Sequence, residues 1–393
     1  MLDTSKARTA SLFVALAVTV VLGVQTGTGV ASAQQEGARE VDEPEVAARA
    51  WALADLRSKE YLAGQAASKK LPIGSTTKIM TGLVVLEGAD LDEEVAVSQN
   101  AAAYATPAYS NVGLLPGDTL SVRELLMAAL ISSGDDAAYA LAEHVGGGGE
   151  TRVNRFVEEM NERAHASGLN NTHFENPVGF DARGHYSSAR DLVEMARLAM
   201  QNPEFSEIVY TEYATIHTLH REIPLASTNE LLASYGPATG IKTGTTPAAG
   251  ESLVSSASTG NESYVCVVLD SEDRFATSMR ALRYGFAAYD RKDLVVEGKP
   301  YASIDVPYSR GKSVDLLAQG GVDGLVDASP EVERDVDLVE DPPDSARAGT
   351  KLGEVVVEVD GKKVGEIRLV AEKGYEEASL GQRVWYTVGG IFQ

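Results

Sequence analysis

Cysteine is almost absent from this sequence. The 393 residues include only Cys266, so no disulfide can form within the chain. Cys266 lies in the apolar run SYVCVVLD, which is typical of a buried strand. Burial among β-branched residues raises the pKa of a thiol and makes it a poor nucleophile. We therefore expect Cys266 to be a core residue.

Basic residues are also scarce. The chain has 34 Lys and Arg against 57 Asp and Glu, which gives a net charge of −23. Because this excess of negative charge repels nucleic acid, nucleic-acid binding is excluded. Part of the excess lies in residues 327–344, DASPEVERDVDLVEDPPD, where eight acids accompany one base. We expect this segment to be a solvated loop or insertion.

Spacings typical of metal ligands are missing. The six histidines show no HExxH pattern, and no paired cysteines accompany them. Only His217 and His220 lie close together, and two ligands are a weak signal. The sequence predicts no metal site and no cofactor.

The long apolar run of the sequence lies at its N-terminus. Residues 10–24 carry no charge, and the run is shorter than the ~20 residues that a membrane-spanning helix needs. Lys6 and Arg8 precede it, and the small residues ASA at 31–33 follow it. This arrangement predicts a secretory signal peptide over residues 1–33, with an uncleaved N-terminal anchor as the alternative. In both cases we expect the body of the protein to be exported to the cell envelope or beyond.

The order of the apolar patterns predicts an α+β fold. After a linker at 34–47, residues 48–67 have the pattern of a hairpin, and helical spacing dominates from 79 to 200. Strands at 251–258 and 262–270 and a helix from about 271 to 289 follow. Strands from the two ends of this segment can meet in one antiparallel sheet packed with helices, beside a helical subdomain. We place this domain at 48–292.

Short alternating runs follow residue 292. Among them GEVVVEVDGKKVGEIRLVAE is a clear hairpin, and we expect residues 293–374 to form a small all-β domain. In the tail at 375–393 the apolar residues of SLGQRVWYTVGGIFQ lie near helical spacing. Gly389 and Gly390 weaken a helix, however, and residues 384–388 fit a last strand equally well.

The segment KKLPIGSTTKIMTGLVVLE, residues 69–87, places Ser75 and Lys78 three positions apart at the start of an apolar helix. Residues at this spacing share one helix face, which brings the amine beside the hydroxyl. Serine is a poor nucleophile without an adjacent base, and a lysine deprotonated by its surroundings can be that base. The positive end of a helix also favours a developing oxyanion. Alone, this spacing is common by chance and fits an N-cap serine beside a solvated lysine.

Two further motifs change this interpretation. Ser133 and Asp135 follow an apolar helix in ISSGDDAAY, and Lys242, Thr243 and Gly244 stand in GIKTGTTPAAG, where glycines leave the backbone open to a ligand. Each motif is unremarkable by itself. In the order SxxK, SxD and KTG, the three match the signature of β-lactamases and penicillin-binding proteins.

The chain resembles the serine-type D-alanyl-D-alanine carboxypeptidases, which are low-molecular-mass penicillin-binding proteins, over roughly residues 45–290. Besides the motifs, FENPVGFDARGHYSSARDLVEMA at 174–196 and STNELLASYGPATGIKTGTT at 227–246 are similar to that family. The C-terminal β domain resembles the second domain of the family more loosely. The resemblance implies a β-lactamase-like fold, peptidoglycan stem peptides ending in D-Ala-D-Ala as substrates, and β-lactams as covalent inhibitors.

The resemblance also implies a role for each motif residue. Ser75 would attack the carbonyl between the two terminal D-alanines and form an acyl-enzyme that water then cleaves. Lys78 would take the proton from Ser75, and Ser133 would relay it toward the leaving amine.

The third motif would bind the end of the substrate. Lys242 with Thr243 or Thr245 would hold the terminal carboxylate, and Gly244 stands between the two threonines. The backbone N–H groups of Ser75 and Thr245 would form the oxyanion hole.

Asp135 departs from the family pattern, in which the second motif usually ends in Asn. An ionised Asp only accepts hydrogen bonds, and its charge would favour the protonated form of Lys78. Asp135 is therefore itself protonated, or accepts from Lys78 while another group donates to the substrate, or activity is reduced. We expect activity with a shifted pH dependence. His185, in GHYSSARD, is expected to be a structural residue that fixes its loop.

Two alternatives stay open from the sequence. A class A β-lactamase needs a glutamate and a water to clear the acyl-enzyme, and Glu175 is the available residue. A cell-wall-binding protein that kept the fold and lost the chemistry is the other, for which Asp135 is the one hint. Members of the family often end in an amphipathic segment that lies on the membrane, so residues 375–393 are a candidate for peripheral membrane contact.

Overall fold

The computed structural model describes residues 41–58 and 60–388. The predicted signal peptide at 1–33 and the first part of the predicted linker lie outside the described residues. Within the described ranges, no helix has both the length and the apolar character needed to cross a membrane.

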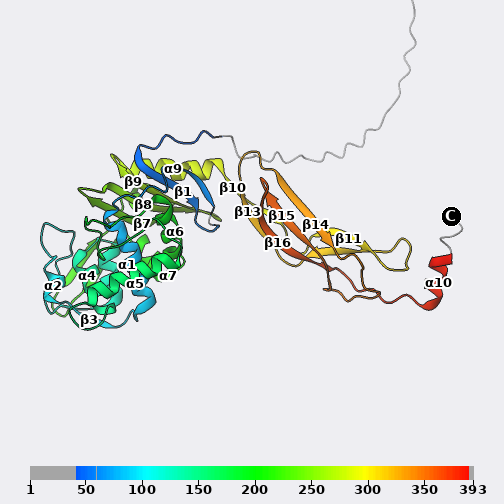
Figure 1. The fold of residues 1–393 in the computed structure, drawn as a ribbon, viewed down its shortest axis with the longest axis horizontal. Helices are drawn as coiled ribbons and strands as arrows, with labels where there is room; N and C mark the ends of the chain where they lie inside the picture. Colours follow the sequence, from blue (N-terminus) through cyan, green and yellow to red (C-terminus); the bar gives the residue numbers. More distant parts are fainter. Residues whose placement is uncertain (1–40, 59, 389–393) are drawn as a thin grey trace, which may run out of the picture. The chain divides into compact units, whose positions relative to one another are not determined.

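An antiparallel five-stranded sheet forms the centre of the first domain (Figure 1). Its strand order is β2-β1-β9-β8-β7, so β1 (Ala48–Asp55), the first strand of the domain, pairs with β9 (Glu262–Ser271), the last. β2 (Tyr61–Gln65) and β7 (Ala238–Thr246) are the edges, and β8 (Gly250–Thr259) lies between β9 and β7. The prediction that strands from both ends of this segment meet in one antiparallel sheet is confirmed.

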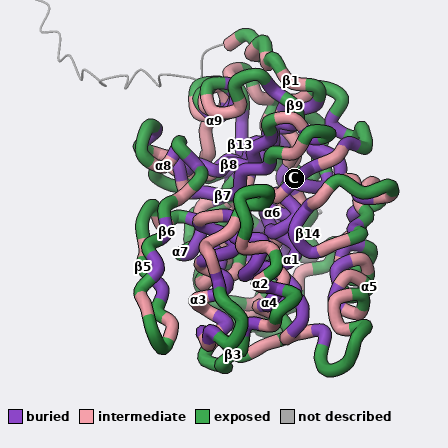
Figure 2. Tube along the Cα trace, turned by 90° about the vertical axis from the view of Figure 1, so that its left-hand side faces the viewer, coloured by how far each residue is buried: buried purple, intermediate pink, exposed green. Residues whose placement is uncertain are grey.

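Helices cover both faces of this sheet, and Figure 2 shows its inner strands as buried segments. Successive residues of a strand point to opposite faces. Accordingly Tyr264 and Cys266 pack with Leu282 of α9 (Arg274–Ala288) on one face, whereas Val265 and Val267 belong to the larger core on the other. Cys266 is fully buried, as predicted, and burial raises the pKa of its thiol to about 12.

The larger core belongs to the helical subdomain. Its central element is α1 (Lys78–Gly88), whose residues 78–85 are all buried. A capping box between Ser121 and Glu124 begins α3. The other elements of the subdomain, between β2 and β7, are η1 (Gly74–Thr77), β3 (Glu94–Ala96), α2 (Gln99–Ala102), β4 (Thr119–Ser121), α3 (Val122–Leu130), α4 (Asp135–Val145), α5 (Arg152–Ala166), α6 (Ala189–Met200), α7 (Pro203–Tyr210), β5 (Tyr213–His217), β6 (Glu222–Ala226) and α8 (Leu231–Ser234).

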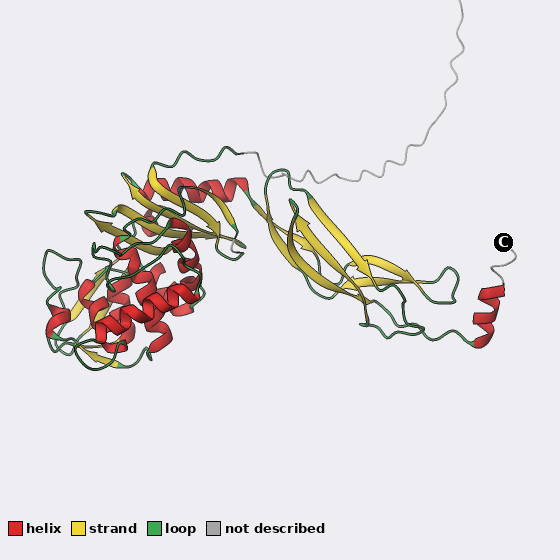
Figure 3. Ribbon diagram, viewed as in Figure 1, coloured by secondary structure: helices red, strands yellow, loops and turns green. Residues whose placement is uncertain are grey.

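The chain after α9 folds as strands until it reaches α10 (Leu380–Val388), as Figure 3 shows. A five-stranded antiparallel sheet has the order β11-β12-β16-β15-β14. A separate two-stranded pair joins β10 to β13. The bounds are β10 (Asp290–Val295), β11 (Pro300–Asp305), β12 (Ser313–Ala318), β13 (Val322–Val326), β14 (Val332–Leu338), β15 (Lys351–Val359) and β16 (Lys362–Ala371). The expected all-β character is confirmed, and β10 runs through residue 292, where the sequence places the domain boundary.

The expectation of a solvated loop at 327–344 is wrong for its central part. β14 lies within this segment as an edge strand paired with β15. Val332 and Val336 pack against the domain core, and the acids between them face solvent. Charged side chains on an edge strand disfavour pairing with a second molecule, so a high acid content is compatible with a strand here.

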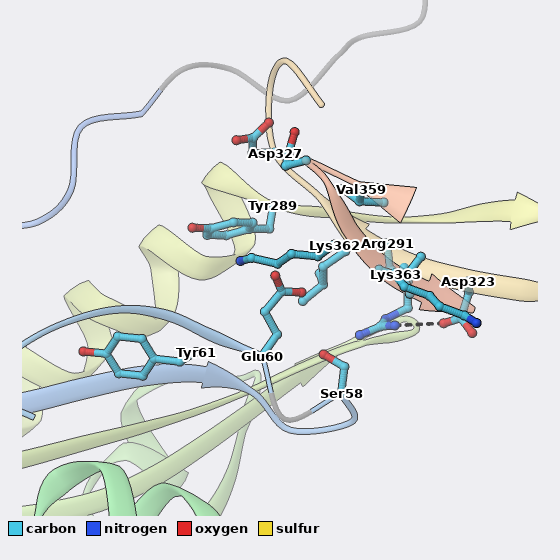
Figure 4. A pocket seen from close by; sticks show the side chains of 14 residues that line it. Ser58, Glu60, Tyr61, Tyr289, Arg291, Asp323, Asp327, Val359, Lys362 and Lys363 are labelled. Carbon is cyan, nitrogen blue, oxygen red and sulfur yellow. Dashed lines mark hydrogen bonds and ion pairs between the residues drawn. The ribbon is translucent and has the colours of Figure 1, made fainter. Parts of the chain in front are cut away.

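Arg291 of β10 connects the two domains. Its guanidinium donates to Asp55 at 2.6 Å and to Asp323 at 2.8 Å, and Figure 4 shows the second of these ion pairs. The side chains of Arg291 and Asp55 are 3% and 0% exposed. The pair is therefore a buried one, in which each charge depends on the other.

Replacing Arg291 by Met should lower the free energy of unfolding by about 3–5 kcal/mol, because Asp55 would keep a buried charge without its partner. Denaturant unfolding of the purified protein measures this. Arg57→Met is the matched control, since Arg57 is half-exposed and lies 3.8 Å from the same Asp323. It should cost under about 1 kcal/mol. Equal losses in the two variants would contradict the prediction.

Candidate active site

The serine turn, η1 (Gly74–Thr77), leads directly into α1. Ser75 is half-buried in this turn, and Lys78, the first residue of α1, is fully buried. The Nζ atom of Lys78 lies 2.9 Å from Oγ of Ser75. It also donates to Oδ1 of Asp135 at 2.6 Å and to the carbonyl oxygen of Val178 at 3.0 Å. The three N–H donors of the lysine therefore have three acceptors.

The second motif lies between α3 and α4. Ser133 is buried and has a left-handed φ of 61°, which is uncommon for a residue with a side chain. Asp135 begins α4, and its backbone N–H donates to the carbonyl of Ser110 at 2.7 Å. Asp135 contacts Lys78 directly, whereas no hydrogen bond among the described residues joins Ser133 to Ser75 or Lys78. The first two motifs thus meet at Lys78.

The third motif forms part of the edge strand β7, which runs beside the serine turn. A Cβ atom on Gly244 would lie 2.5 Å from the carbonyl oxygen of Ile73 and 3.1 Å from the backbone nitrogen of Thr76. Any side chain at this position would therefore push the strand away from the turn. Lys242 is 1% exposed, and its Nζ donates to the carbonyl of Thr243 at 3.2 Å. Glycine at position 244 is what lets the first and third motifs lie side by side.

The hydroxyls of the third motif have partners that the motif spacing does not reveal. Oγ1 of Thr243 lies 2.6 Å from Oγ1 of Thr228. Arg274, at the start of α9, donates to Oγ1 of Thr245 at 2.6 Å and to the carbonyl of Gly244 at 3.3 Å. A second cation thus accompanies Lys242 at the end of β7. Sequence reasoning missed Arg274 because it belongs to no motif and lies 29 residues from Thr245.

A loop at 176–180 packs against the other side of the serine turn. The sequence motifs did not indicate its part in the site. Oδ1 of Asn176 accepts hydrogen bonds from the backbone N–H groups of residues 178, 179 and 180, which holds the loop in shape. Gly179, with φ of 98°, lies so close that a Cβ atom would be 2.0 Å from the carbonyl oxygen of Gly74. The loop thereby places the carbonyl of Val178 on Lys78. A backbone acceptor leaves no trace in side-chain patterns.

Burial and mutual charge interactions shift the pKa values of Lys78, Asp135 and Lys242. Burial lowers the pKa of Lys78, and the attraction of Asp135 opposes part of that effect. Burial raises the pKa of Asp135, and Lys78 opposes that. Burial, followed by the positive charge of Lys78, lowers the pKa of Lys242 well below its ordinary value. Both lysines are therefore easier to deprotonate than exposed ones.

The two other residues considered from the sequence make no hydrogen bond to Ser75 or Lys78 among the described residues. The Glu175 carboxylate is half-exposed and 3.3 Å from Nε2 of His173, and no hydrogen bond among the described residues joins it to Ser75 or Lys78. His185 is 5% exposed and contacts Thr77 behind the serine turn. The described part of the chain contains no group of three or more His, Cys, Asp or Glu that could hold a metal ion.

Comparison with known proteins assigns the chain to a family. The sequence profile of the D-alanyl-D-alanine carboxypeptidases, peptidase family S11, matches residues 37–273. The chain belongs to this family. The carboxypeptidase DacC of Escherichia coli is 32% identical over 368 residues, which is 88% of this chain and 88% of DacC.

Solved structures of other D-alanyl-D-alanine peptidases are also similar to this S11 chain. The crystal structure of the Streptomyces K15 DD-transpeptidase is 36% identical, with a TM-score of 0.60, and covers 63% of this chain and all of its own. The D-alanyl-D-alanine carboxypeptidase DacD of Francisella tularensis covers 88% of this chain and 98% of its own, with a TM-score of 0.66. At 23% identity, DacD shows a shared fold that includes much of the C-terminal domain.

Asp135→Asn in this S11 enzyme should move the acidic limb of the pH–rate profile to lower pH. Asp135 stabilises the charged form of Lys78, so its removal lowers the pKa of Lys78 further, and the neutral amine persists at lower pH. The rate of acylation by a fluorescent penicillin, measured from pH 4 to 9, tests this. Asp323→Asn, which removes the same charge from β13, should leave the profile unchanged. Superimposable profiles for wild type and Asp135→Asn would contradict the prediction.

Proposed function

We propose that this protein is a serine D-Ala-D-Ala carboxypeptidase in which Ser75 is the nucleophile and Lys78 its base. The activity removes the terminal D-alanine from peptidoglycan stem pentapeptides. The observation that supports these two roles most directly is the 2.9 Å contact between Oγ of Ser75 and Nζ of a fully buried lysine. Burial favours the neutral amine, which is the form that accepts a proton from a hydroxyl.

The reaction follows from this pair. Neutral Lys78 takes the hydroxyl proton as Oγ of Ser75 bonds to the carbonyl carbon between the two D-alanines. The C–N bond then breaks, and the proton passes to the leaving amine of D-alanine, by way of Ser133 in our proposal. Water, deprotonated by the same lysine, next attacks the ester carbon, and the Ser75 oxygen leaves with the proton. The nucleophile and the base thus regain their starting states.

The carboxylate of the terminal D-alanine is assigned to the end of β7. Lys242, Thr245 and Arg274 supply cations and a hydroxyl there, and charge-assisted hydrogen bonds are the strong ones for a carboxylate. Thr243 is assigned the same task, with Thr228 as its neighbour. The positive charge of Lys78 contributes to the lowered pKa of Lys242. A bound carboxylate at this place would oppose that effect and favour the charged form of Lys242.

The oxyanion hole is assigned to the backbone N–H groups of Ser75 and Thr245. A Cβ atom on Gly74 would lie 3.0 Å from the nitrogen of Thr245, so the strand amide and the serine turn are immediate neighbours. The loss of one oxyanion donor costs other enzymes about 2.7–4 kcal/mol in the barrier, so the aim of these amides matters as much as the nucleophile.

The two alternatives are less well supported. Glu175 pairs with His173 and makes no hydrogen bond to Ser75 or Lys78 among the described residues, so nothing in its contacts favours the second base of a class A β-lactamase. The intact contact between Ser75 and Lys78 argues against a protein that only binds the cell wall.

Ser75→Ala should reduce D-alanine release from a pentapeptide ending in D-Ala-D-Ala by at least about 10³-fold, since the residues of such a unit act together. The same variant should lose covalent labelling by fluorescent penicillin. Ser206→Ala, which changes a partly exposed serine whose hydroxyl donates to the carbonyl of Pro203, is the matched control and should retain both.

Two results would overturn this assignment. Release of D-alanine by Ser75→Ala at the wild-type rate would remove the nucleophile. Rapid hydrolysis of penicillin by wild type, in place of a stable adduct, would favour the β-lactamase.

We further propose that the enzyme is exported through residues 1–33 and touches the membrane surface through its C-terminus. Residues 380–388 form a helix, so the helical interpretation of the tail is the one that the fold supports. Leu380, Val384 and Trp385 of α10 are 83%, 61% and 67% exposed. Arg310 lies over the ring of Trp385, which places a cation beside these apolar side chains. Exposed apolar residues next to basic ones suit an interface between water and lipid.

Deleting residues 375–393 should move the enzyme from the membrane fraction to the soluble fraction of cells that express it. The wild-type enzyme should resist a salt wash and be released by detergent, because apolar burial is insensitive to salt screening. A double variant, Val384→Gln with Trp385→Gln, should behave like the deletion. Leu219→Gln, which changes an apolar residue that is 76% exposed and lies outside α10, is the control. An unchanged membrane fraction after deletion would contradict the proposal.

A further inference from the structure

His185 lies behind the serine turn and is tied to it by a specific hydrogen bond. Its Nδ1 accepts from the backbone N–H of Glu175 at 3.1 Å. A backbone N–H can only donate, so Nδ1 carries the lone pair and the ring proton is on Nε2. Burial lowers the pKa of His185 to about 4, which keeps the ring neutral at neutral pH. Nε2 lies 2.8 Å from Oγ1 of Thr77 and therefore donates to it.

Thr77 passes this interaction on to the backbone. Its Oγ1 donates to the carbonyl oxygen of Gly74 at 2.8 Å. Both His185 and Thr77 are buried, which limits competition from water for these bonds. A directed chain thus runs from the N–H of Glu175 through the imidazole and the hydroxyl to the carbonyl of Gly74.

The peptide that receives this chain also carries the N–H of Ser75. It is a trans peptide, in which the carbonyl and the N–H point in opposite directions. Holding the carbonyl of Gly74 therefore fixes the direction of the N–H of Ser75. Gly179 presses on the same peptide from another side, since its Cβ position would lie 2.0 Å from the Gly74 oxygen and 2.9 Å from the Ser75 nitrogen.

We propose that His185 and Thr77 are positioning residues that aim the N–H of Ser75 at the oxyanion of the tetrahedral intermediate. This inference rests on the proposed function, in which the N–H of Ser75 is one of two oxyanion donors. Donation into the carbonyl of a peptide also polarises its N–H, so the chain strengthens the donor that it aims. Neither residue touches the substrate, and their effect is exerted through the Gly74–Ser75 peptide.

The serine turn contains a matched control for this idea. Oγ1 of Thr76 donates to the carbonyl of Ile73 at 2.8 Å, and Thr76 is as completely buried as Thr77. The two hydroxyls make the same kind of bond one residue apart. The bond of Thr76, however, holds the Ile73–Gly74 peptide, whose N–H belongs to Gly74. Thr76→Val and Thr77→Val remove comparable bonds from the same turn, but only the second acts on the oxyanion donor.

The test is the rate of acylation by a fluorescent penicillin as a function of its concentration. This gives a limiting acylation rate and a half-saturating concentration for each variant. We expect Thr77→Val to lower the limiting rate at least tenfold while the half-saturating concentration stays within threefold, because only the transition state needs the oxyanion donor. Thr76→Val should change both by less than threefold. Thr77→Ser, which keeps the hydroxyl, should restore the wild-type rate.

A boronic acid that forms a tetrahedral adduct with serine gives a second readout. Its inhibition constant should rise for Thr77→Val by about the factor by which acylation slows, and should not rise for Thr76→Val. If Thr77→Val does not fold, His185→Gln against His185→Leu replaces it, since glutamine keeps an N–H donor for Thr77 and leucine has none. The glutamine variant should then be the faster of the two.

Equal limiting rates for Thr76→Val and Thr77→Val at equal melting temperature would overturn the inference. So would an effect of Thr77→Val on the half-saturating concentration alone, or equal rates for the two His185 variants. In each of these cases wild type is still labelled, so the proposed function survives. A wild-type protein that neither binds penicillin covalently nor releases D-alanine would overturn both.

Discussion

The buried amine of Lys78 is the constraint on which the rest of the site depends. Moving an ammonium group from water to a protein interior costs several kcal/mol, and an attraction to a carboxylate at 4 Å returns about 4 kcal/mol at an effective dielectric constant of 20. The free-energy cost of burying the ammonium and the gain from its attraction to Asp135 are thus close in size. The contact with Asp135 at 2.6 Å keeps the charged form accessible, and burial keeps the neutral form within reach. A base that must gain and lose a proton in each cycle needs this balance.

The architecture follows from the acceptors that this amine requires. One comes from the serine turn, one from the start of α4 and one from the backbone of the loop at 176–180. Strand β7 then approaches the same turn closely enough that Gly244 has no room for a side chain. Segments that are 57 and 100 residues from Lys78 in the sequence thus meet around one nitrogen atom. In our proposal, a chain of hydrogen bonds from His185 through Thr77 to the carbonyl of Gly74 also fixes the direction of the Ser75 N–H, which is an oxyanion donor.

Side-chain periodicity predicted much of this arrangement. The three-residue spacing of Ser75 and Lys78 predicted their contact, and the order of hairpin, helices and strands predicted the pairing of β1 with β9. The carbonyl of Val178 and the guanidinium of Arg274 could not be predicted, because a backbone acceptor and a residue outside any motif carry no periodic signal. At 327–344 the high acid content led to the prediction of a loop, although the spacing of Val332 and Val336 fits the strand β14. His185 was expected to fix its loop, but its partner Thr77 is apparent only from the folded structure.

A titration of the lysine Cε atoms by ¹³C NMR would show whether Lys78 is deprotonated more easily than an exposed lysine. Protein labelled at Lys Cε would be titrated from pH 6 to 12, with the Lys78 signal assigned by its absence in Lys78→Gln. We expect the midpoint of Lys78 to lie clearly below that of the exposed lysines, and to fall further in Asp135→Asn. A Lys78 signal that titrates together with the exposed lysines would show that burial does not make Lys78 a base.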